Sequence, residues 1–395
     1  MIMARCRPGA LTLFFGALGL LVGVGAPQGA SAQSLFSGGG LGMPADPVEA
    51  RSRAMGGVQV GLPGWQISMV DPASAAGLLL PSITATVQPS TIQPAGELSG
   101  GGSRFPLVGV SYPFGRHVIS LQLGSFLDQE WEVRSERSIP LGEGTVSAVD
   151  VLSSLGSVGQ VRMGWAFPMT QDLAVGANIG TYIGSVEKRF RRDLDAAGLD
   201  VGVEPFFSST RWRASGPMAS AGVVWNPSAL FRLAGAVEWS GDLEMDPQNE
   251  DGSERSYPMA MTVRGGGTFT LAPDLLLTLG ASAADWSETA AALDDGGARD
   301  RAFSYGGGIE WTRATLRGRS MPVRVGYGSR QLPFHFRGEA VDESSFAAGF
   351  GLNLASSETI PTARIDVTVE RGSRTAVSLT EEFWRGAISI RLAGN

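Results

Sequence analysis

The chain has 395 residues, of which 43% are hydrophobic, 55 are glycine and only 17% are charged, and its formal net charge is -7. Glycine is about twice its usual share near 7%, and charged residues fall below the usual quarter. An acidic chain without clustered lysine and arginine lacks the cations that phosphate contacts need, so nucleic acid is excluded as a partner.

The first 32 residues have the three-part layout of a secretory signal peptide. Arg5 and Arg7 precede an apolar run over residues 11–24, and residues 30–32 read Ala-Ser-Ala before Gln33. The apolar run is shorter than the roughly 20 residues of a spanning helix, which argues against an uncleaved anchor. We therefore expect residues 1–32 to be removed on export, leaving a net charge of about -9 because two of the arginines leave with them.

Residues 33–81 are rich in glycine, alanine and proline and lack long alternation. They are interpreted as a compact, loop-rich segment with a short helix near residues 71–79. Two locations are open to this segment. It could be a tail in the periplasm, or it could fold back into the lumen of the barrel predicted below.

From about Ser82 to the end, short stretches carry a large apolar residue at every second position. Phe231, Leu233 and Val237 interleave with Arg232 and Glu238, and only a period-2 strand puts those sets on opposite faces. There are about 14 such segments, an even number as in bacterial single-chain barrels. They are 82–93, 105–114, 117–128, 156–168, 172–187, 206–225, 229–240, 258–271, 274–287, 302–312, 321–331, 343–354, 362–371 and 381–392.

The fold class that follows is all-β, with residues 82–395 forming a transmembrane antiparallel up-and-down β-barrel in the bacterial outer membrane. No apolar run after Gln33 approaches the length of a spanning helix, so any membrane span must be made of strands. The second face of the strands mixes glycine with isolated charges, which suits a confined polar lumen better than open water. A secreted soluble β-protein, with those charges on the solvated side of a sheet, is the alternative.

The connections between the predicted strands alternate in length. Tight turns are expected at 113–116, 168–171, 226–228 and 272–274, and long polar connections at 128–154, 188–204, 241–256 and 288–301. An up-and-down barrel with small periplasmic turns and large external loops produces this rhythm.

The strand pattern also assigns side chains to the lumen and to the lipid interface. Charges of both signs in a narrow lumen tend to pair, because an unpaired ion away from bulk water is costly, so we expect an obstructed lumen. The predicted lumen charges are Arg162, Arg232, Glu238, Arg264, Glu310, Arg324, Arg364, Asp366, Glu370 and Arg391. Aromatic residues near strand ends, interpreted as an interfacial girdle, are Trp165, Phe167, Trp225, Trp239, Trp286, Tyr305, Trp311 and Trp384.

The residues that would carry catalysis are missing. Cys6 is the only cysteine and lies in the segment to be removed, so the mature chain has no disulfide, thiolate metal site or cysteine nucleophile. The two histidines, His117 and His335, stand in no catalytic or metal-binding spacing. We predict that the protein is not an enzyme and uses no metal and no cofactor.

Two segments near the mature start carry a family resemblance. Residues 53–58 (Arg-Ala-Met-Gly-Gly-Val), followed by residues 71–78 (Asp-Pro-Ala-Ser-Ala-Ala-Gly-Leu), resemble the start of the long-chain fatty acid transporter (FadL-like) family of outer-membrane proteins. In that family two such segments form an N-terminal hatch ahead of a 14-stranded barrel. The resemblance thus implies a hatch at residues 33–81 that contains Arg53, Ala54, Met55, Gly56, Gly57, Asp71, Pro72 and Ala73. Stretches over 326–334, 346–354 and 370–385 are similar to closing strands of relatives of that family.

Two departures from the family pattern stand out. Asp71 occupies a position where the family usually has asparagine, and it adds a negative charge to the hatch. The chain ends Leu-Ala-Gly-Asn, without the terminal aromatic residue common in outer-membrane barrels, which puts its recognition by the barrel-assembly machinery in doubt.

The resemblance implies an outer-membrane transporter or channel for hydrophobic compounds of the long-chain fatty acid or hydrocarbon class, gated by the hatch. Its partners would be a hydrophobic small molecule, outer-membrane lipid and the barrel-assembly machinery, and it would be a monomer. Leu332, Pro333, Phe334 and Phe336, in a loop predicted to be external, are the candidate ligand-capture residues; the alternative is a loop cluster that only packs on its neighbours. A structural or secretion-associated barrel that presents its loops to partner proteins is the second functional hypothesis.

Overall fold

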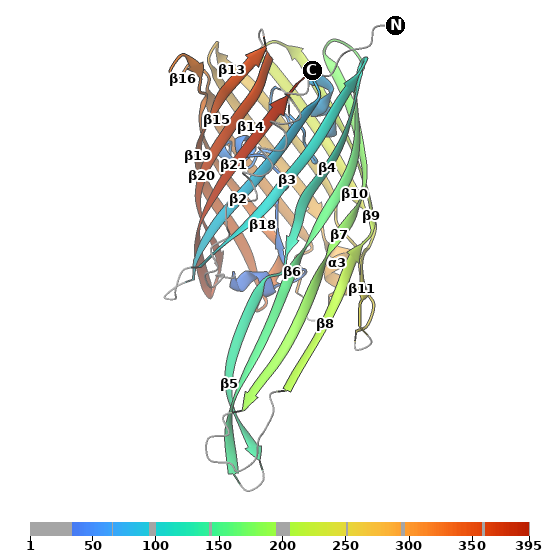
Figure 1. Cartoon of the computed structure of the whole chain (residues 1–395), viewed down its shortest axis with the longest axis vertical. Coiled ribbons are helices and arrows are strands. Elements are labelled where there is room, and N and C mark those ends of the chain that lie inside the picture. Colours follow the sequence, from blue (N-terminus) through green and yellow to red (C-terminus); the bar gives the residue numbers. More distant parts are fainter. Residues whose placement is uncertain are drawn as a thin grey trace, which may run out of the picture.

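The computed structural model describes residues 34–64, 66–94, 100–141, 144–194, 206–249, 252–293, 297–357 and 360–394. The expected signal peptide lies outside these residues. In the part of the chain described, 14 strands close into one antiparallel barrel, because the last strand pairs with the first (Figure 1). The predicted fold class and strand number are confirmed.

The strands of the barrel wall are β2 (Ser82–Pro94), β3 (Gly100–Phe114), β4 (His117–Asp128), β6 (Gly144–Pro168), β7 (Leu173–Leu194), β9 (Pro217–Ser228), β10 (Phe231–Ser240), β13 (Met261–Ala272), β14 (Leu275–Asp285), β15 (Arg301–Trp311), β18 (Val323–Phe336), β19 (Glu339–Ser357), β20 (Ile360–Ala376) and β21 (Leu379–Ala393). Each predicted segment overlaps one of them. The segment predicted at 206–225 is in fact two strands, because β8 (Phe206–Ser215) ends at Gly216, whose φ of 141° favours glycine. β8 pairs with the outer part of β7, whereas β9 continues the wall.

On one side of the barrel the wall strands extend far beyond the others, toward the bottom of the view in Figure 1. There β5 (Trp131–Leu141), the outer parts of β6 and β7, β8, β11 (Leu243–Pro247) and β12 (Arg255–Tyr257) form what we call the projecting sheet. The prediction of polar loops over 128–154 and 188–204 is wrong for the described part of those ranges. Strands beyond the membrane need no lipid-facing side, so charged residues stand where a wall strand has apolar ones. These charges pair across strands, as Arg211 does with Glu187 at 2.5 Å.

The outward face of the wall is apolar. Leu121, Ile179, Val325 and Phe346 expose between 51% and 70% of their surface. A belt of this kind would be a large hydrophobic patch in water, so it requires a lipid exterior. Of the predicted girdle, Trp165, Trp225, Trp239, Tyr305, Trp311 and Trp384 are exposed. Trp286 is an exception, because it packs against a buried apolar cluster.

Residues 34–81 fill the lumen and are called the hatch below. The hatch contains η1 (Leu35–Gly38), β1 (Met43–Pro44), α2 (Ala50–Ala54) and η2 (Pro72–Gly77). It begins near the end that bears the projecting sheet and leads into β2 at the opposite end, where the short turns lie (Figure 1). The two remaining elements, α3 (Ser287–Ala292) and the hairpin of β16 (Thr315–Leu316) and β17 (Arg319–Ser320), belong to connections between wall strands and are not part of the wall. Within the described residues, no helix has the length and hydropathy that crossing a bilayer requires.

Candidate functional site

Glycines of the wall receive the backbone of the hatch. Gly306 and Gly326 lie against Gly56, and a Cβ added to Gly306 would be 2.1 Å from the Gly56 carbonyl oxygen. Gly56 itself has a φ of 75°, a conformation that side chains disfavour. These wall glycines therefore mark positions where the backbone of the hatch touches the barrel, which the sequence alone did not indicate.

Polar side chains of the wall satisfy the backbone carbonyls of the hatch. Thr368 Oγ1 donates to the Ala50 carbonyl at 2.6 Å, Thr268 Oγ1 to Gly61 at 3.0 Å, and Asn178 Nδ2 to Met69 at 3.0 Å. The hatch has little regular structure, so these buried carbonyls need donors from elsewhere. The polar face of the strands supplies them.

Asp71 stands at the start of η2 and is fully buried. Its Oδ2 accepts a hydrogen bond from the Gly61 N–H at 3.2 Å, and its Oδ1 has no hydrogen-bond partner among the described residues. Burial raises the pKa of this carboxyl, which lies in the hatch and outside the spanning strands, to about 6. Pro72, next in the chain, lies against two wall glycines, Gly176 and Gly222.

A first group of lumen charges joins α2 to strands β15, β18 and β20. Arg51 pairs with Glu310 at 2.7 Å, and Glu310 also pairs with Arg324. Arg324 reaches Asp366 at 2.7 Å, and Asp366 in turn binds Arg364 at 2.8 Å. The chain of alternating charges links the hatch to three strands.

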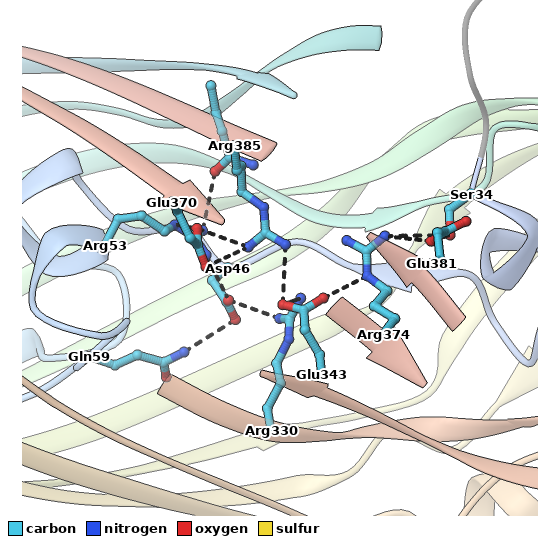
Figure 2. Close-up of polar contacts among 11 residues, drawn as sticks. Ser34, Asp46, Arg53, Gln59, Arg330, Glu343, Glu370, Arg374, Glu381 and Arg385 are labelled. Atoms are coloured by element: carbon cyan, nitrogen blue, oxygen red, sulfur yellow. Dashed lines mark hydrogen bonds and ion pairs between the residues drawn. The ribbon is translucent and has the colours of Figure 1, made fainter. Parts of the chain in front are cut away.

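A second group of lumen charges is drawn in Figure 2, and strand register places it nearer the projecting end. On the hatch side, Asp46 contacts Arg53 at 3.6 Å and Arg330 at 2.9 Å. On the wall side, Arg330 and Arg385 both reach Glu343, at 2.9 and 3.1 Å. Glu370 also belongs to the group and pairs with Arg385 and Arg53. Arg374 pairs with Glu343 and with Glu381. Glu381 in turn accepts a hydrogen bond from the Ser34 hydroxyl.

The other predicted lumen charges are also directed inward. Glu238 is shared by Arg162 at 2.9 Å and Arg264 at 3.3 Å, and Arg162 is only 2% exposed. Arg391 pairs with Glu49 of the hatch. Arg232 donates to the side chain of Asn226 at 3.2 Å, at the turn that precedes β10.

Sequence reasoning missed Arg330, Glu343 and Arg374 as lumen charges. Arg330 lies an even number of residues after Arg324 on β18, so both face the same side. Arg374 stands in the same relation to Asp366 and Glu370 on β20. Arg330 and Glu343 lie within predicted segments and Arg374 lies just beyond one, so assigning a face to every residue of each segment, and extending the last assignment past its end, would have found them.

A cavity with one apolar and one polar side, called the apolar cavity after the first of these, lies between the hatch and the elements at the projecting end. Its volume is about 140 Å³, and its apolar lining includes Phe126, Tyr182, Met259, Trp286 and Leu332. Four of these residues belong to or pack against a buried cluster of side chains from the wall, the projecting sheet and the connections at that end of the barrel. Arg162, Glu238, Arg264 and Arg330 close its polar side.

The wall itself is open between β3 and β4 at the projecting end. The two strands pair from Phe114 and His117 only as far as Leu107 and Gly124. Beyond this point Pro106 has no N–H to donate to the ladder, and β4 shifts register between Ser125 and Leu127.

Two side-chain contacts bridge the unpaired residues. The Ser125 hydroxyl donates to the Phe105 carbonyl at 3.0 Å, and Arg104 pairs with Asp128 at 2.8 Å. We call the gap between residues 102–105 and 125–128 the lateral opening. It leads to a second cavity, of about 370 Å³.

The hatch strand β1 occupies the edge of β4 that β3 leaves free. Met43 pairs with Asp128 and Pro44 with Leu127, and the Ala45 N–H donates to the Phe126 carbonyl at 2.8 Å. Pro44, Ala45 and Asp46 line both the apolar cavity and the cavity behind the lateral opening. This short hatch segment is thus the partition between the two cavities.

The four predicted capture residues lie on β18 rather than on a loop, so that part of the prediction is wrong. Strand pairing resumes at His335 after an irregularity, which carries β18 to Phe336. Leu332 and Phe334 are buried in a cluster with Phe36 of the hatch, and Phe336 packs against it. Leu332 and Pro333 also line the apolar cavity.

Among solved structures, three proteins superpose over nearly their whole length. The CymD monoaromatic hydrocarbon channel matches at 13% identity and a TM-score of 0.59, covering 92% of this chain and 99% of that one. The Ralstonia pickettii toluene transporter TbuX gives 15% identity and 0.60 (89% and 99% covered), and a Pseudomonas aeruginosa FadL homologue gives 12% and 0.60 (90% and 99% covered). The chain has the FadL-like fold.

The resemblance to the FadL-like proteins seen in the sequence is therefore confirmed at the level of the fold. No family model and no curated protein matches the sequence. Identity this low shows shared architecture only.

Proposed function

We propose that this protein is an outer-membrane channel for hydrophobic compounds, exported by a cleaved signal peptide and gated by its hatch. The observation that carries the proposal is the partition: one short hatch segment, held on the free edge of β4, separates an apolar cavity from an opening in the barrel wall. Three neighbours of similar fold are named as a monoaromatic hydrocarbon channel, a toluene transporter and a FadL homologue, which supports the same assignment.

The apolar cavity suits a small hydrophobic group. A wholly apolar cavity of roughly 150 Å³ in another protein binds benzene, so a cavity of about 140 Å³ has room for one aromatic ring or the end of an alkyl chain against its apolar side. A ligand would reach it from the projecting end and lose its water against Phe126, Tyr182 and Met259. Release of β1 from β4 would then connect the cavity with the lateral opening.

A disulfide between β1 and β4 tests this gate. Pro44 and Leu127 are direct cross-strand partners, so Pro44→Cys/Leu127→Cys should form a bond under oxidation. We expect cells carrying the oxidised variant to take up labelled toluene or labelled long-chain fatty acid at least about tenfold more slowly, with recovery after reduction. Val87→Cys/Ile388→Cys, which tethers two neighbouring wall strands, is the matched control and should not change uptake.

The possible outcomes separate the gate from the function. Wild-type uptake by the oxidised variant would refute the gate. Equal uptake by cells with and without the protein would refute transport itself and favour the structural or secretion-associated barrel, for which the projecting sheet would be the docking surface.

A further inference from the structure

The polar side of the apolar cavity is built from charges that hold one another in place. Arg162 and Arg264 both pair with Glu238, at 2.9 and 3.3 Å. Arg162 Nε also donates to Gln160 Oε1 at 3.0 Å, and Arg264 Nε donates to Gln59 Oε1 at 2.7 Å. One carboxylate and two guanidinium groups therefore form a fixed part of the cavity lining.

Two atoms of this arrangement have hydrogen-bonding capacity to spare. Both hydrogen bonds that Glu238 accepts go to its Oε2, and its Oε1 accepts none from the described residues. Arg264 donates through Nε and Nη1, and its Nη2 reaches no acceptor in the same part of the chain. Both residues line the cavity, and both atoms keep some exposed surface, unlike the sealed Oδ1 of Asp71. An unused acceptor and an unused donor of one ion pair thus lie beside the cavity.

Other polar groups of the lining bond to each other. The Tyr182 hydroxyl donates to Ser240 Oγ at 2.9 Å, and the hydroxyl oxygens of Ser282 and Ser304 are 2.6 Å apart. The apolar side has room for one aromatic ring. A ligand that fills the cavity therefore meets carbon on one side and the free donor and acceptor on the other.

We propose that the ligand of this cavity is a small phenol, that is, an aromatic ring that bears a neutral hydroxyl. The inference rests on the proposed function and names the chemical class of its solute. The ring lies against the apolar side of the cavity. The hydroxyl donates a hydrogen bond to Glu238 Oε1, and its oxygen accepts one from Arg264 Nη2.

A hydroxyl is the group that satisfies both atoms at once. A hydrocarbon of the same shape would displace water and leave the donor and the acceptor unpaired, which is costly for buried polar groups. A carboxylate would accept from Arg264, but it carries no hydrogen for Glu238 Oε1 and has the same charge. We therefore expect a phenol to bind more tightly than the matching hydrocarbon or carboxylate.

Three probes that differ in one substituent test this order. They are 4-methylphenol, p-xylene and 4-methylbenzoate, each isotope-labelled; at about pH 7 the phenol is neutral and the benzoate is ionised. Equilibrium dialysis measures their binding to the purified full chain in a neutral maltoside detergent, and binding to protein-free micelles is subtracted. We expect 4-methylphenol to bind at least about tenfold more tightly than either of the others, because a site built to hold a hydroxyl rejects analogues that leave its polar groups unpaired.

Glu238→Gln should change the order in a direction specific to this site. The amide keeps the shape of the side chain, but the two arginines lose their shared anion. We expect 4-methylphenol to bind about tenfold more weakly and 4-methylbenzoate about tenfold more tightly. Glu187→Gln is the matched control, because Glu187 is likewise shared by two arginines, Arg189 at 2.6 Å and Arg211 at 2.5 Å. It lies on the projecting sheet, away from the cavity lining, and should leave all three affinities unchanged.

Two results would overturn the proposal. The first is binding of p-xylene or 4-methylbenzoate to the wild type as tight as that of 4-methylphenol. This comparison needs no variant, so it decides the matter even if Glu238→Gln does not fold. The second is unchanged affinity for both 4-methylphenol and 4-methylbenzoate in a Glu238→Gln protein that still migrates as a heat-modifiable band.

The binding order is separate from the channel assignment. If p-xylene binds as tightly as 4-methylphenol and cells with the protein still take up labelled toluene, the phenol class is wrong and the channel stands. If the purified protein prefers 4-methylphenol but cells with and without it take up all three probes equally, the site is confirmed and transport is refuted.

Discussion

At the scale of single residues, the burial of one carboxyl in the hatch is the clearest anomaly. Asp71 has one oxygen bonded to the Gly61 amide and the other without a hydrogen-bond partner in the described residues. Its raised pKa means that the ionised form is less stable in the closed hatch than in water. The family resemblance places asparagine here, a neutral side chain of the same shape.

We predict that Asp71→Asn stabilises the hatch in a pH-dependent way. The folded pKa of about 6 lies above the ordinary aspartate value of 3.8, so ionisation costs the closed hatch stability as the pH rises through this window. The substitution should raise the opening free energy by about 3 kcal/mol at pH 8 and by only about 0.5 kcal/mol at pH 4. Hydrogen exchange of the amides over residues 58–72 measures it, and an equal gain at both pH values would contradict the explanation.

At the scale of elements, the fit between hatch and wall depends on missing side chains. Gly306 of β15 leaves no room for a methyl group beside Gly56, whereas Gly265 of β13 faces open space. The two positions share a residue type and a strand environment, yet only one touches the hatch.

Gly306→Ala should therefore displace the hatch, and Gly265→Ala should not. A Cβ 2.1 Å from a backbone oxygen cannot be accommodated unless α2 and the following turn move. We expect liposomes that contain Gly306→Ala to leak a small sugar severalfold faster than those with wild type, and those with Gly265→Ala to match wild type. Identical leakage by both variants would show that the turn at Gly56 does not seal the lumen.

At the scale of the whole molecule, the lumen is filled by the hatch, and the charges of hatch and wall neutralise one another, so it is not an open pore. Hatch and wall exchange charges of both signs, so neither part has its full set of partners without the other. Removing one side of buried ion pairs leaves uncompensated charge, which water must then enter to solvate.

Deleting residues 34–81 should convert the plugged barrel into a leaky one. The 14 strands pair with each other around the full circumference, so the wall should still form and migrate as a heat-modifiable band on a gel. Small-solute leakage in liposomes should rise by an order of magnitude or more. Unchanged permeability would count against a hatch, and a monodisperse wild-type protein in buffer without detergent would count against the membrane barrel altogether.

The sequence by itself determined the barrel, because lipid outside and a polar interior impose an alternation that is visible in single strands such as β10. It also identified many of the charges that face inward, since side-chain direction follows from strand phase, but it missed Arg330, Glu343 and Arg374. Tertiary structure alone decided which of those charges meet, how the hatch threads among the wall glycines, and that β1 replaces β3 on the edge of β4. These contacts join residues tens to hundreds of positions apart, and no local pattern encodes such a distance. The strands β5, β11 and β12 and the outer parts of β6 and β7 escaped prediction for another reason: beyond the membrane a strand has no lipid-facing side, so these strands lack the apolar period that reveals a strand in a membrane.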